Sequence, residues 1–271
     1  ALAFAHISAA LQAFTQDAGI AAQAIVPVSA LVGYNVVDAN PGWCGYQGPT
    51  LLALLEKLSA TPADITQPFS FPVQWVEKFS SSADTSQGRR IFWGRIASGA
   101  VQVGQRVSVL PGGKSALVAE VLDHARIPKA VGAGHSAGII LDRELDVSRG
   151  DVLLATDGFG PSPGKRELTA TVAWMDDEPL LPGRLYWALQ GHRWVKAKVQ
   201  RIVHQVNIQT LAHQPATQLD ANAIGVVELV LQAPIVALPF AQSRILGSLV
   251  LVDTASHKTS GAALILSAHE G

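Results

Sequence analysis

Residues 88–122 read GRRIFWGRIASGAVQVGQRVSVLPGGKSALVAEVL and carry the clearest structural pattern in the chain. Apolar side chains alternate with other residues over 91–96 and again over 101–109, with an interruption at Gly104. Turn residues separate these runs, Ala97-Ser98-Gly99 first and then Pro111-Gly112-Gly113. A period of two bounded by Gly and Pro predicts antiparallel strands. We therefore expect a meander whose third strand begins near Leu117. Because an open meander leaves unpaired edges, we expect it to close into a barrel.

Short apolar runs of the same kind continue to the end of the chain. The first barrel is expected over 71–157, with its last strands at 137–141 and 152–155. A Gly/Pro-rich linker, 158–165, follows it. Further runs, spaced by roughly 8–12 residues, predict a second antiparallel barrel over 166–271. Its expected strands are 168–175, 184–189, 193–208, 225–231, 248–252 and 261–267.

The first 60 residues follow a different pattern. An apolar stripe predicts a helix over 1–17 that Gly19 ends, and the run AIVPV, 24–28, predicts a short strand. A second helix is expected to open at Gly48-Pro49-Thr50, with Pro49 as its first residue and an apolar face of Leu51, Leu52, Leu55 and Leu58. We interpret 1–60 as the remnant of an α/β domain and 61–70 as a linker. The predicted fold class is mainly β, two antiparallel β-barrels preceded by this remnant.

Composition excludes several classes of protein. The 271 residues carry a net charge of −1, which argues against a large nucleic-acid footprint. The single cysteine, Cys44, cannot form an internal disulfide, which favours a reducing compartment, and we expect a cytoplasmic protein. No apolar run reaches the roughly 20 residues that span a bilayer. The histidines lack the close pairing of a metal site, so we expect no metal ligand.

Several motifs invite a catalytic interpretation that their context does not support. Gly113-Lys114-Ser115 resembles the end of a phosphate-binding loop, but that pattern needs a glycine at position 108, where the chain has Ser108. Three adjacent acids, 176–178, precede a proline at a predicted turn. Arg149-Gly150-Asp151 suits an acidic turn that leads into a strand. We assign no catalytic residue.

One basic run is kept as a candidate contact. Around Trp194, the chain carries Arg193, Lys196, Lys198 and Arg201. These side chains are suited to phosphate or to an acidic partner, and the simpler interpretation is a solvated strand face. A contact between this run and a partner protein is the alternative interpretation.

The order of an α/β remnant and two barrels resembles the GTPases related to elongation factor Tu. Ser29-Ala30-Leu31, after an apolar run, resembles their last guanine-recognition motif, in which the N–H of the middle residue reaches the guanine O6. Further motifs resemble the large, GTP-binding subunit of bacterial sulfate adenylyltransferase (ATP sulfurylase). They are Gly48–Leu52 after Trp43, Phe71–Gln74, Ala97–Gly99, Val103–Val107, Leu110-Pro111, Ser148–Asp151, Val172–Met175, Gln205–Ile208 and Gly261-Ala262.

The sequence departs from that family in two places. Cys44-Gly45, between Trp43 and Tyr46, resembles a small insertion. The phosphate loop, the switch regions and the Asn-Lys-x-Asp guanine motif are missing from these residues. The resemblance therefore implies a C-terminal fragment that lacks most of the GTP-binding domain. Only Ser29, Ala30 and Leu31 would remain of the nucleotide site.

The resemblance also implies a function for the full-length protein. That subunit would bind GTP and Mg²⁺ and pair with a smaller catalytic subunit, and together they would make adenosine 5′-phosphosulfate and pyrophosphate from ATP and sulfate. The fragment itself is expected to be inactive and to bind no cofactor. Two alternatives stay open, a fragment of a translational GTPase that holds tRNA or the ribosome, and a scaffolding β-protein without a nucleotide.

Overall fold

The computed structural model describes residues 1–59, 65–78, 90–157, 159 and 164–270, which form two compact units, Ala1–Pro62 and Ala63–Gly271. Parts of both predicted linkers, 61–64 and 158–163 except Phe159, lie outside the described residues, as do residues 88–89. None of the helices described is both long and apolar enough to cross a membrane.

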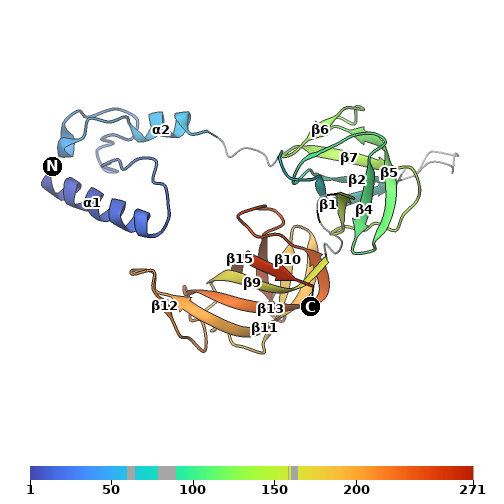
Figure 1. The fold of residues 1–271 in the computed structure, drawn as a ribbon. Helices are drawn as coiled ribbons and strands as arrows, with labels where there is room; N and C mark the ends of the chain where they lie inside the picture. The colour runs from blue at the N-terminus through green and yellow to red at the C-terminus, as the bar shows by residue number, and fades with distance from the viewer. Residues whose placement is uncertain (60–64, 79–89, 158, 160–163, 271) are drawn as a thin grey trace. The chain divides into compact units, whose positions relative to one another are not determined.

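The first unit contains two α-helices and a short 3₁₀ turn, which Figure 1 shows in blue. Helix α1 spans Leu2–Asp17 as predicted, and Gly19 follows with φ +66°. The predicted strand at 24–28 is wrong, because the described part of this unit contains no strand. A strand depends on hydrogen bonds to a neighbouring strand, and the described residues 1–59 contain no strand that could pair with this segment.

The second helix begins later than the sequence suggested. Helix α2 spans Leu51–Lys57, and Thr50 caps it, its Oγ1 accepting a hydrogen bond from Ala53 N at 3.2 Å. Pro49 therefore precedes the cap and is not the first helical residue, because a threonine hydroxyl satisfies a free helical N–H directly. No residue of either helix is buried, and the four leucines of the predicted apolar face are 38–56% exposed. The 3₁₀ turn η1 spans Trp43–Gly45.

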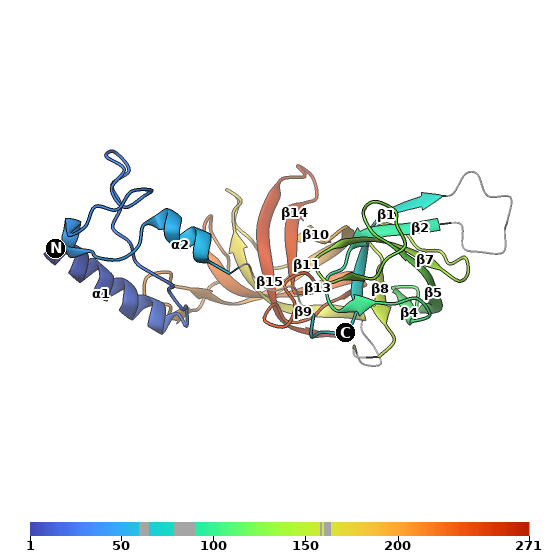
Figure 2. The same cartoon turned by 90° about the horizontal axis from the view of Figure 1, so that it is seen from above.

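Six strands of the second unit close into the first barrel, in the order β1-β2-β7-β5-β4-β8. Figure 2 shows β1 and β2 side by side, as their antiparallel pairing requires. Phe71, Phe92, Ile139 and Leu153 belong to the buried core of this barrel. The strands are β1 (Ser70–Lys78), β2 (Arg90–Arg95), β4 (Arg106–Leu110), β5 (Lys114–Leu122), β7 (Ser136–Leu141) and β8 (Val152–Ala155), with a separate pair of β3 (Ala100–Val101) and β6 (Val131–Gly132).

The meander predicted for 88–122 is only half correct. Strands β4 and β5 form the expected hairpin, but β2 pairs with β1 and β7 and never with β4. The reason lies at the first predicted turn. Gly99 has φ +65° and packs so closely on the preceding segment that an added Cβ would lie 2.7 Å from Phe69 N. The Ser70 and Ser98 hydroxyl oxygens lie 2.6 Å apart, and the two residues form an isolated bridge, so this turn lies beside the start of β1.

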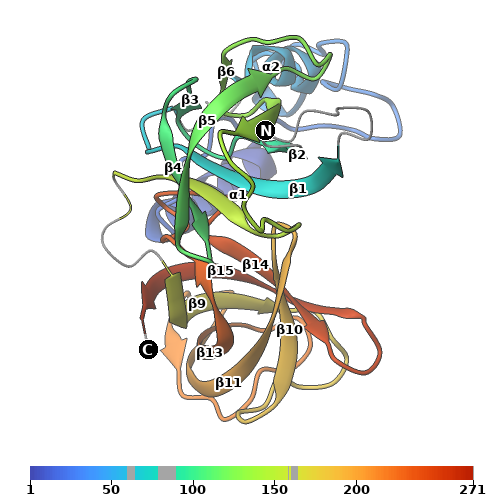
Figure 3. The ribbon, with the colours of Figure 1, turned by 90° about the vertical axis from the view of Figure 1, so that its right-hand side faces the viewer.

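The second barrel closes in the same way with a different strand order. Its sheet runs β10-β14-β15-β9-β13-β11-β12, and the additional pairing of β10 with β11 closes six strands into a ring that leaves β12 outside. Figure 3 shows this ring. The first and last strands are neighbours, with Glu167 opposite His269. The strands are β9 (Gly164–Trp174), β10 (Leu185–Gln190), β11 (Arg193–Val206), β12 (His213–Gln214), β13 (Ile224–Val236), β14 (Ser248–Asp253) and β15 (Thr259–His269).

An aromatic pair lies in the buried core of the second barrel. Trp174 and Tyr186 are both fully buried and meet edge to face, with ring centroids 5.3 Å apart. Trp174 Nε1 donates to Glu178 O at 2.7 Å. The Tyr186 hydroxyl has no hydrogen-bond partner among the described residues, and burial raises its pKa to about 12. The expected fold class, two antiparallel barrels in a mainly β chain, is confirmed.

Candidate functional site

The predicted guanine contact, Ser29–Leu31, forms a tight turn in the first unit. Ser29 provides most of its internal bonds: its N–H donates to Tyr34 O at 3.2 Å, and its carbonyl accepts from Gly33 N at 2.7 Å. Ser29 Oγ also accepts from Val32 N at 3.4 Å. The N–H of Ala30 donates to no acceptor among the described residues, and the Leu31 side chain is 96% exposed. The turn therefore leaves the Ala30 N–H available to a ligand.

Asn35 holds this turn in place, and the sequence interpretation did not identify it. The side chain is buried, and its Nδ2 donates to Pro27 O at 3.1 Å while its Oδ1 accepts from Asn40 N at 2.8 Å. The Asn35 backbone has φ 56°, a conformation that asparagine tolerates better than most residues. Asn35 O also accepts from Leu51 N at 2.9 Å. One residue thus connects the segment before the turn to the start of α2.

An open depression of about 730 Å³ lies beside the turn. Its lining includes Ala30, Gly33, Tyr34 and Asp38. The free N–H of Ala30 and an apolar wall are suited to one edge and one face of a planar base. The described lining includes no lysine or arginine, so it offers no cation for a phosphate.

The structure separates the predicted basic run into two kinds of side chain. Arg201 donates to both carboxylate oxygens of Glu228, from Nε at 2.7 Å and from Nη2 at 2.6 Å. Arg193 Nη1 lies 3.3 Å from Asp151 Oδ1. Both arginines thus have a carboxylate partner within the chain.

The two lysines of the run are different. Lys196 and Lys198 point outward from β11, exposed, while Val195, Ala197 and Val199 face the barrel core. No carboxylate among the described residues lies within ion-pair distance of either lysine. Lys196 Nζ lies 5.4 Å from the centroid of the Trp187 ring. Their charge is therefore available at the surface.

The junction between the two barrels uses the Arg149-Gly150-Asp151 turn. Gly150 has φ +93° and lies against the turn of the second barrel, where an added Cβ would be 2.8 Å from His192 O. Arg149 Nη2 lies 3.4 Å from His192 Nδ1, and burial, then the charge of Arg149, lowers the pKa of His192. Burial raises the pKa of Asp151, against the opposing effect of the Ser148 N–H and of Arg193. Gly150 of this turn is buried against the second barrel, while Arg149 stays exposed at the edge of the contact.

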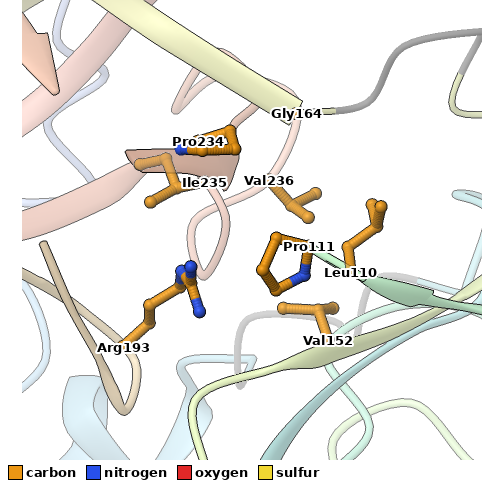
Figure 4. Close-up of a pocket in the computed structure, with 8 residues that line it drawn as sticks. All are labelled: Leu110, Pro111, Val152, Gly164, Arg193, Pro234, Ile235 and Val236. Carbon is orange, nitrogen blue, oxygen red and sulfur yellow. The ribbon is translucent and has the colours of Figure 1, made fainter. Parts of the chain in front are cut away.

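A small cavity of about 50 Å³ lies at the same junction. Figure 4 shows the Arg193 guanidinium pointing into a space bordered by Pro111, Ile235 and Val236. Arg193 Nε is buried and has no hydrogen-bond partner among the described residues. An apolar seam of Val152, Leu154, Val236 and Leu246 lies between the barrels. The cavity has room for water-sized groups only.

The acidic cluster 176–178 stabilises turns of the second barrel. Asp176 Oδ2 accepts from Ser260 Oγ at 2.7 Å, a bond that lowers the pKa of Asp176. Arg184 lies between Glu178, at 2.7 Å, and Asp253, at 3.1 Å. Within the part of the chain that the structure describes, no three His, Cys, Asp or Glu side chains form a metal-binding group. Asp176 and Glu178 thus have structural partners within the second barrel.

Comparisons with known proteins extend these observations. Residues 167–266 match the protein family described as GTP-eEF1A C-terminal domain-like. Solved structures of sup35 complexed with GDP and with GMPPNP resemble this chain with a TM-score of 0.67 and 21% identity, over 90% of this chain and 58% of theirs. This likeness establishes the fold alone.

Curated relatives are closer in sequence. The bifunctional enzyme CysN/CysC of Xylella fastidiosa is 38% identical over 260 residues, which are 96% of this chain and 40% of that protein. Sulfate adenylyltransferase subunit 1 of Erwinia tasmaniensis is 36% identical over 242 residues, 89% of this chain and 49% of that protein. The chain spans about half the length of the curated relatives it matches, or less. Over most of its length it is thus homologous to part of the sulfate adenylyltransferase subunit 1 proteins, which confirms the resemblance inferred from its motifs.

Proposed function

We propose that this chain is the C-terminal part of the GTPase subunit of sulfate adenylyltransferase. The observation that carries the proposal is 36–38% identity to these subunits over 89–97% of the chain. In the proposed reaction, sulfate attacks the α-phosphorus of ATP, the bond to the β-phosphate breaks, and adenosine 5′-phosphosulfate and pyrophosphate form. Hydrolysis of GTP on this subunit drives that uphill step, and a smaller subunit carries out the adenylyl transfer in the cytoplasm.

The part of the nucleotide site proposed for this chain is the Ser29–Leu31 turn. In it, the Ala30 N–H donates to the guanine O6, which the unused donor at that position supports. GTP phosphates and Mg²⁺ require a glycine-rich loop at a helix N-terminus, a lysine and metal ligands. Those groups are proposed to belong to the full-length protein outside these residues.

The two barrels are proposed to transmit the nucleotide state as one body. Their apolar seam, the Asp151–Arg193 ion pair and the Gly150 contact join them. A GTPase cycle needs an element that has two discrete positions. A pair of barrels joined in this way is suited to moving as that element.

The test uses the full-length protein together with its small partner. Pyrophosphate release from ATP is expected to require sulfate and to increase when GTP is added, with little increase from GDP. If the pair forms no adenosine 5′-phosphosulfate under any nucleotide, the proposed function is wrong. Preferential binding of tRNA by the full-length protein would instead support the translational alternative.

A single variant tests the guanine contact within the same assay. Ala30→Pro removes one backbone N–H and leaves a residue of similar size. Loss of one hydrogen bond costs about 0.5–1.5 kcal/mol, so the GTP concentration for half-maximal stimulation is expected to rise about two- to twelvefold while the KM for ATP stays unchanged. An unchanged GTP requirement, in a variant whose circular dichroism matches the wild type, would remove Ala30 from the site.

A further inference from the structure

One outer face of the second barrel gathers aromatic and aliphatic side chains beside two lysines. Across the β10–β11 pairing, Leu185 lies opposite Lys198, Trp187 opposite Lys196, and Leu189 opposite Trp194. Trp194 is 51% exposed and Leu185 is 47% exposed. We call this surface the β10–β11 face and define it by Leu185, Trp187, Trp194, Lys196, Lys198 and Val230.

The β10–β11 face has a defined geometry. The rings of Trp187 and Trp194 meet edge to face at 89°, with centroids 6.5 Å apart, and Lys196 Nζ lies over the Trp187 ring. Beside them a groove of about 310 Å³ is lined by residues of three strands, Leu185 from β10, Lys196 and Lys198 from β11, and Val230, Leu231 and Gln232 from β13. These side chains sit on paired strands, so little order has to be gained when something binds.

Charge is what sets this face apart from an ordinary surface. The neighbouring cations on β11 form ion pairs, Arg193 with Asp151 and Arg201 with Glu228. Lys196 and Lys198 have no such carboxylate among the described residues. Two uncompensated positive charges border an exposed apolar groove in a chain whose net charge is −1. The complementary ligand is therefore apolar at its centre and negative at its edge.

We propose that the β10–β11 face is the docking surface for a segment of a partner protein that has an apolar anchor flanked by acidic residues. The identification of that partner as the small catalytic subunit rests on the proposed function. Tryptophan is enriched among the residues that dominate binding energy, and charges at the rim of an interface mainly increase the association rate. The groove supplies a site for the anchor, and the lysines supply the rim.

The composition of this face favours a protein over a nucleic acid. Nucleic-acid surfaces depend on several Lys or Arg contacts to phosphates, whereas this face offers two free lysines beside Leu185 and Val230. Aliphatic groove walls suit an apolar side chain better than a phosphate backbone.

The experiment measures association of the full-length protein with its small partner at low and moderate ionic strength. Lys196→Glu with Lys198→Glu is expected to reduce the association rate about tenfold at low salt and less at higher salt. Trp194→Ala is expected to raise the dissociation rate about tenfold with a smaller effect on association. The matched control is Lys114→Glu with Lys129→Glu, which makes the same charge change on the first barrel and is expected to leave both rates within twofold.

Each outcome has a defined meaning, provided that thermal unfolding shows the variants folded. If the wild-type pair is active and both β10–β11 variants bind normally, the docking inference is wrong while the proposed function stands. If the control variant weakens binding as much as the lysine variant, the loss of binding comes from the changed net charge of the protein, and the inference is wrong. If the wild-type proteins neither associate nor form product, both are overturned. If the full-length protein binds single-stranded RNA or tRNA, and the lysine variant abolishes that binding, the ligand of the β10–β11 face is a nucleic acid and the docking inference is wrong.

Discussion

Gly150 shows how much of the contact between the barrels depends on a single residue. Its φ of +93° lies in the region that residues with a Cβ avoid, and its backbone approaches the second barrel closely. Gly183 has a similar φ of +88° with no atom within 4 Å of an added Cβ. Comparing alanine variants of these two glycines therefore distinguishes the cost of backbone strain from the cost of disturbing the contact between the barrels.

Gly150→Ala is expected to destabilise the protein more than Gly183→Ala. Both variants carry the strain of a left-handed residue, about 1–2 kcal/mol, and only Gly150→Ala adds a steric conflict with His192 O, which typically costs about 1–3 kcal/mol. Urea unfolding followed by tryptophan fluorescence provides the comparison. Equal losses of unfolding free energy in the two variants would show that the turn does not press on the second barrel.

Asp253 is expected to make the stability depend on pH in the acidic range. Its Oδ1 accepts from Ser256 N at 2.7 Å, Ser256 Oγ at 2.9 Å and Ala255 N at 3.0 Å, and these bonds, with Arg184 on Oδ2, lower the pKa of Asp253 strongly. A carboxyl group whose pKa is lower in the folded state contributes stability above its unfolded pKa, near 4. That contribution is lost as the pH falls.

Asp253→Asn should therefore lower the unfolding midpoint at pH 7 and flatten its decline between about pH 5 and pH 3. The matched control is Asp177→Asn, because the exposed Asp177 side chain accepts no hydrogen bond among the described residues. A decline of the same steepness in Asp253→Asn and wild type would contradict this account.

At the level of single residues, the sequence identifies charges but not their partners. Arg193 and Arg201 look like free cations in a basic run, yet their carboxylates lie 42 and 27 residues away in the sequence. Such pairs exist only once the strand register is set. Asn35 had a weak local signal, since asparagine in a Gly- and Asn-containing loop often adopts φ > 0. Its buried bonds to Pro27 and Asn40 were not predictable from that signal.

At the level of elements, periodicity predicted the positions of the strands well. It predicted the pairing between strands less well. The alternation of β9 and β11 identified these strands within a few residues at each end, whereas the single strand expected over 101–109 is divided into β3 and β4. Pairing depends on contacts over long sequence separations, and the Gly99 turn sends the chain away from β2 for a reason that only the packing reveals. A register shift in β5 between Val118 and Glu120 brings both Val118 and Val121 into the core, which strict alternation excludes.

The helices of the first unit are expected to exchange their amide hydrogens faster than the barrels. Neither α1 nor α2 has a buried residue, while β9 and β13 lie in the core of a closed ring. Local opening is easiest where few apolar groups are buried. Hydrogen exchange read by mass spectrometry should show at least about a hundredfold faster exchange in 2–57 than in β9 and β13. Equal protection would mean that another surface covers the helices.

For the whole molecule, composition and element order predicted two barrels, since each strand pattern is local and the need to remove sheet edges is general. The groove between β10, β11 and β13 could not be predicted from the sequence, because it joins residues that are far apart in the sequence.

The chain by itself is expected to bind GTP poorly. Affinity for a nucleoside triphosphate comes mainly from groups around the phosphates, and the depression beside Ala30 is lined by no lysine or arginine among the described residues. Calorimetry with GTP and Mg²⁺ should show no binding at micromolar concentrations, with the full-length protein as the positive control. A clear micromolar isotherm for the chain would mean that a phosphate site exists within it.

The pairing of β9 with β15 has a consequence for how this barrel can be joined to other proteins. Because Glu167 lies opposite His269 and Lys165 Nζ lies 3.6 Å from Glu270 Oε1, the barrel starts and finishes at one point on its rim. A short connector can therefore join the two ends, and the chain can be reopened at another turn with every strand keeping its neighbours, the arrangement that circular permutation requires. The same geometry suits insertion of this barrel as a domain into a loop of another protein, because both of its ends connect at one place.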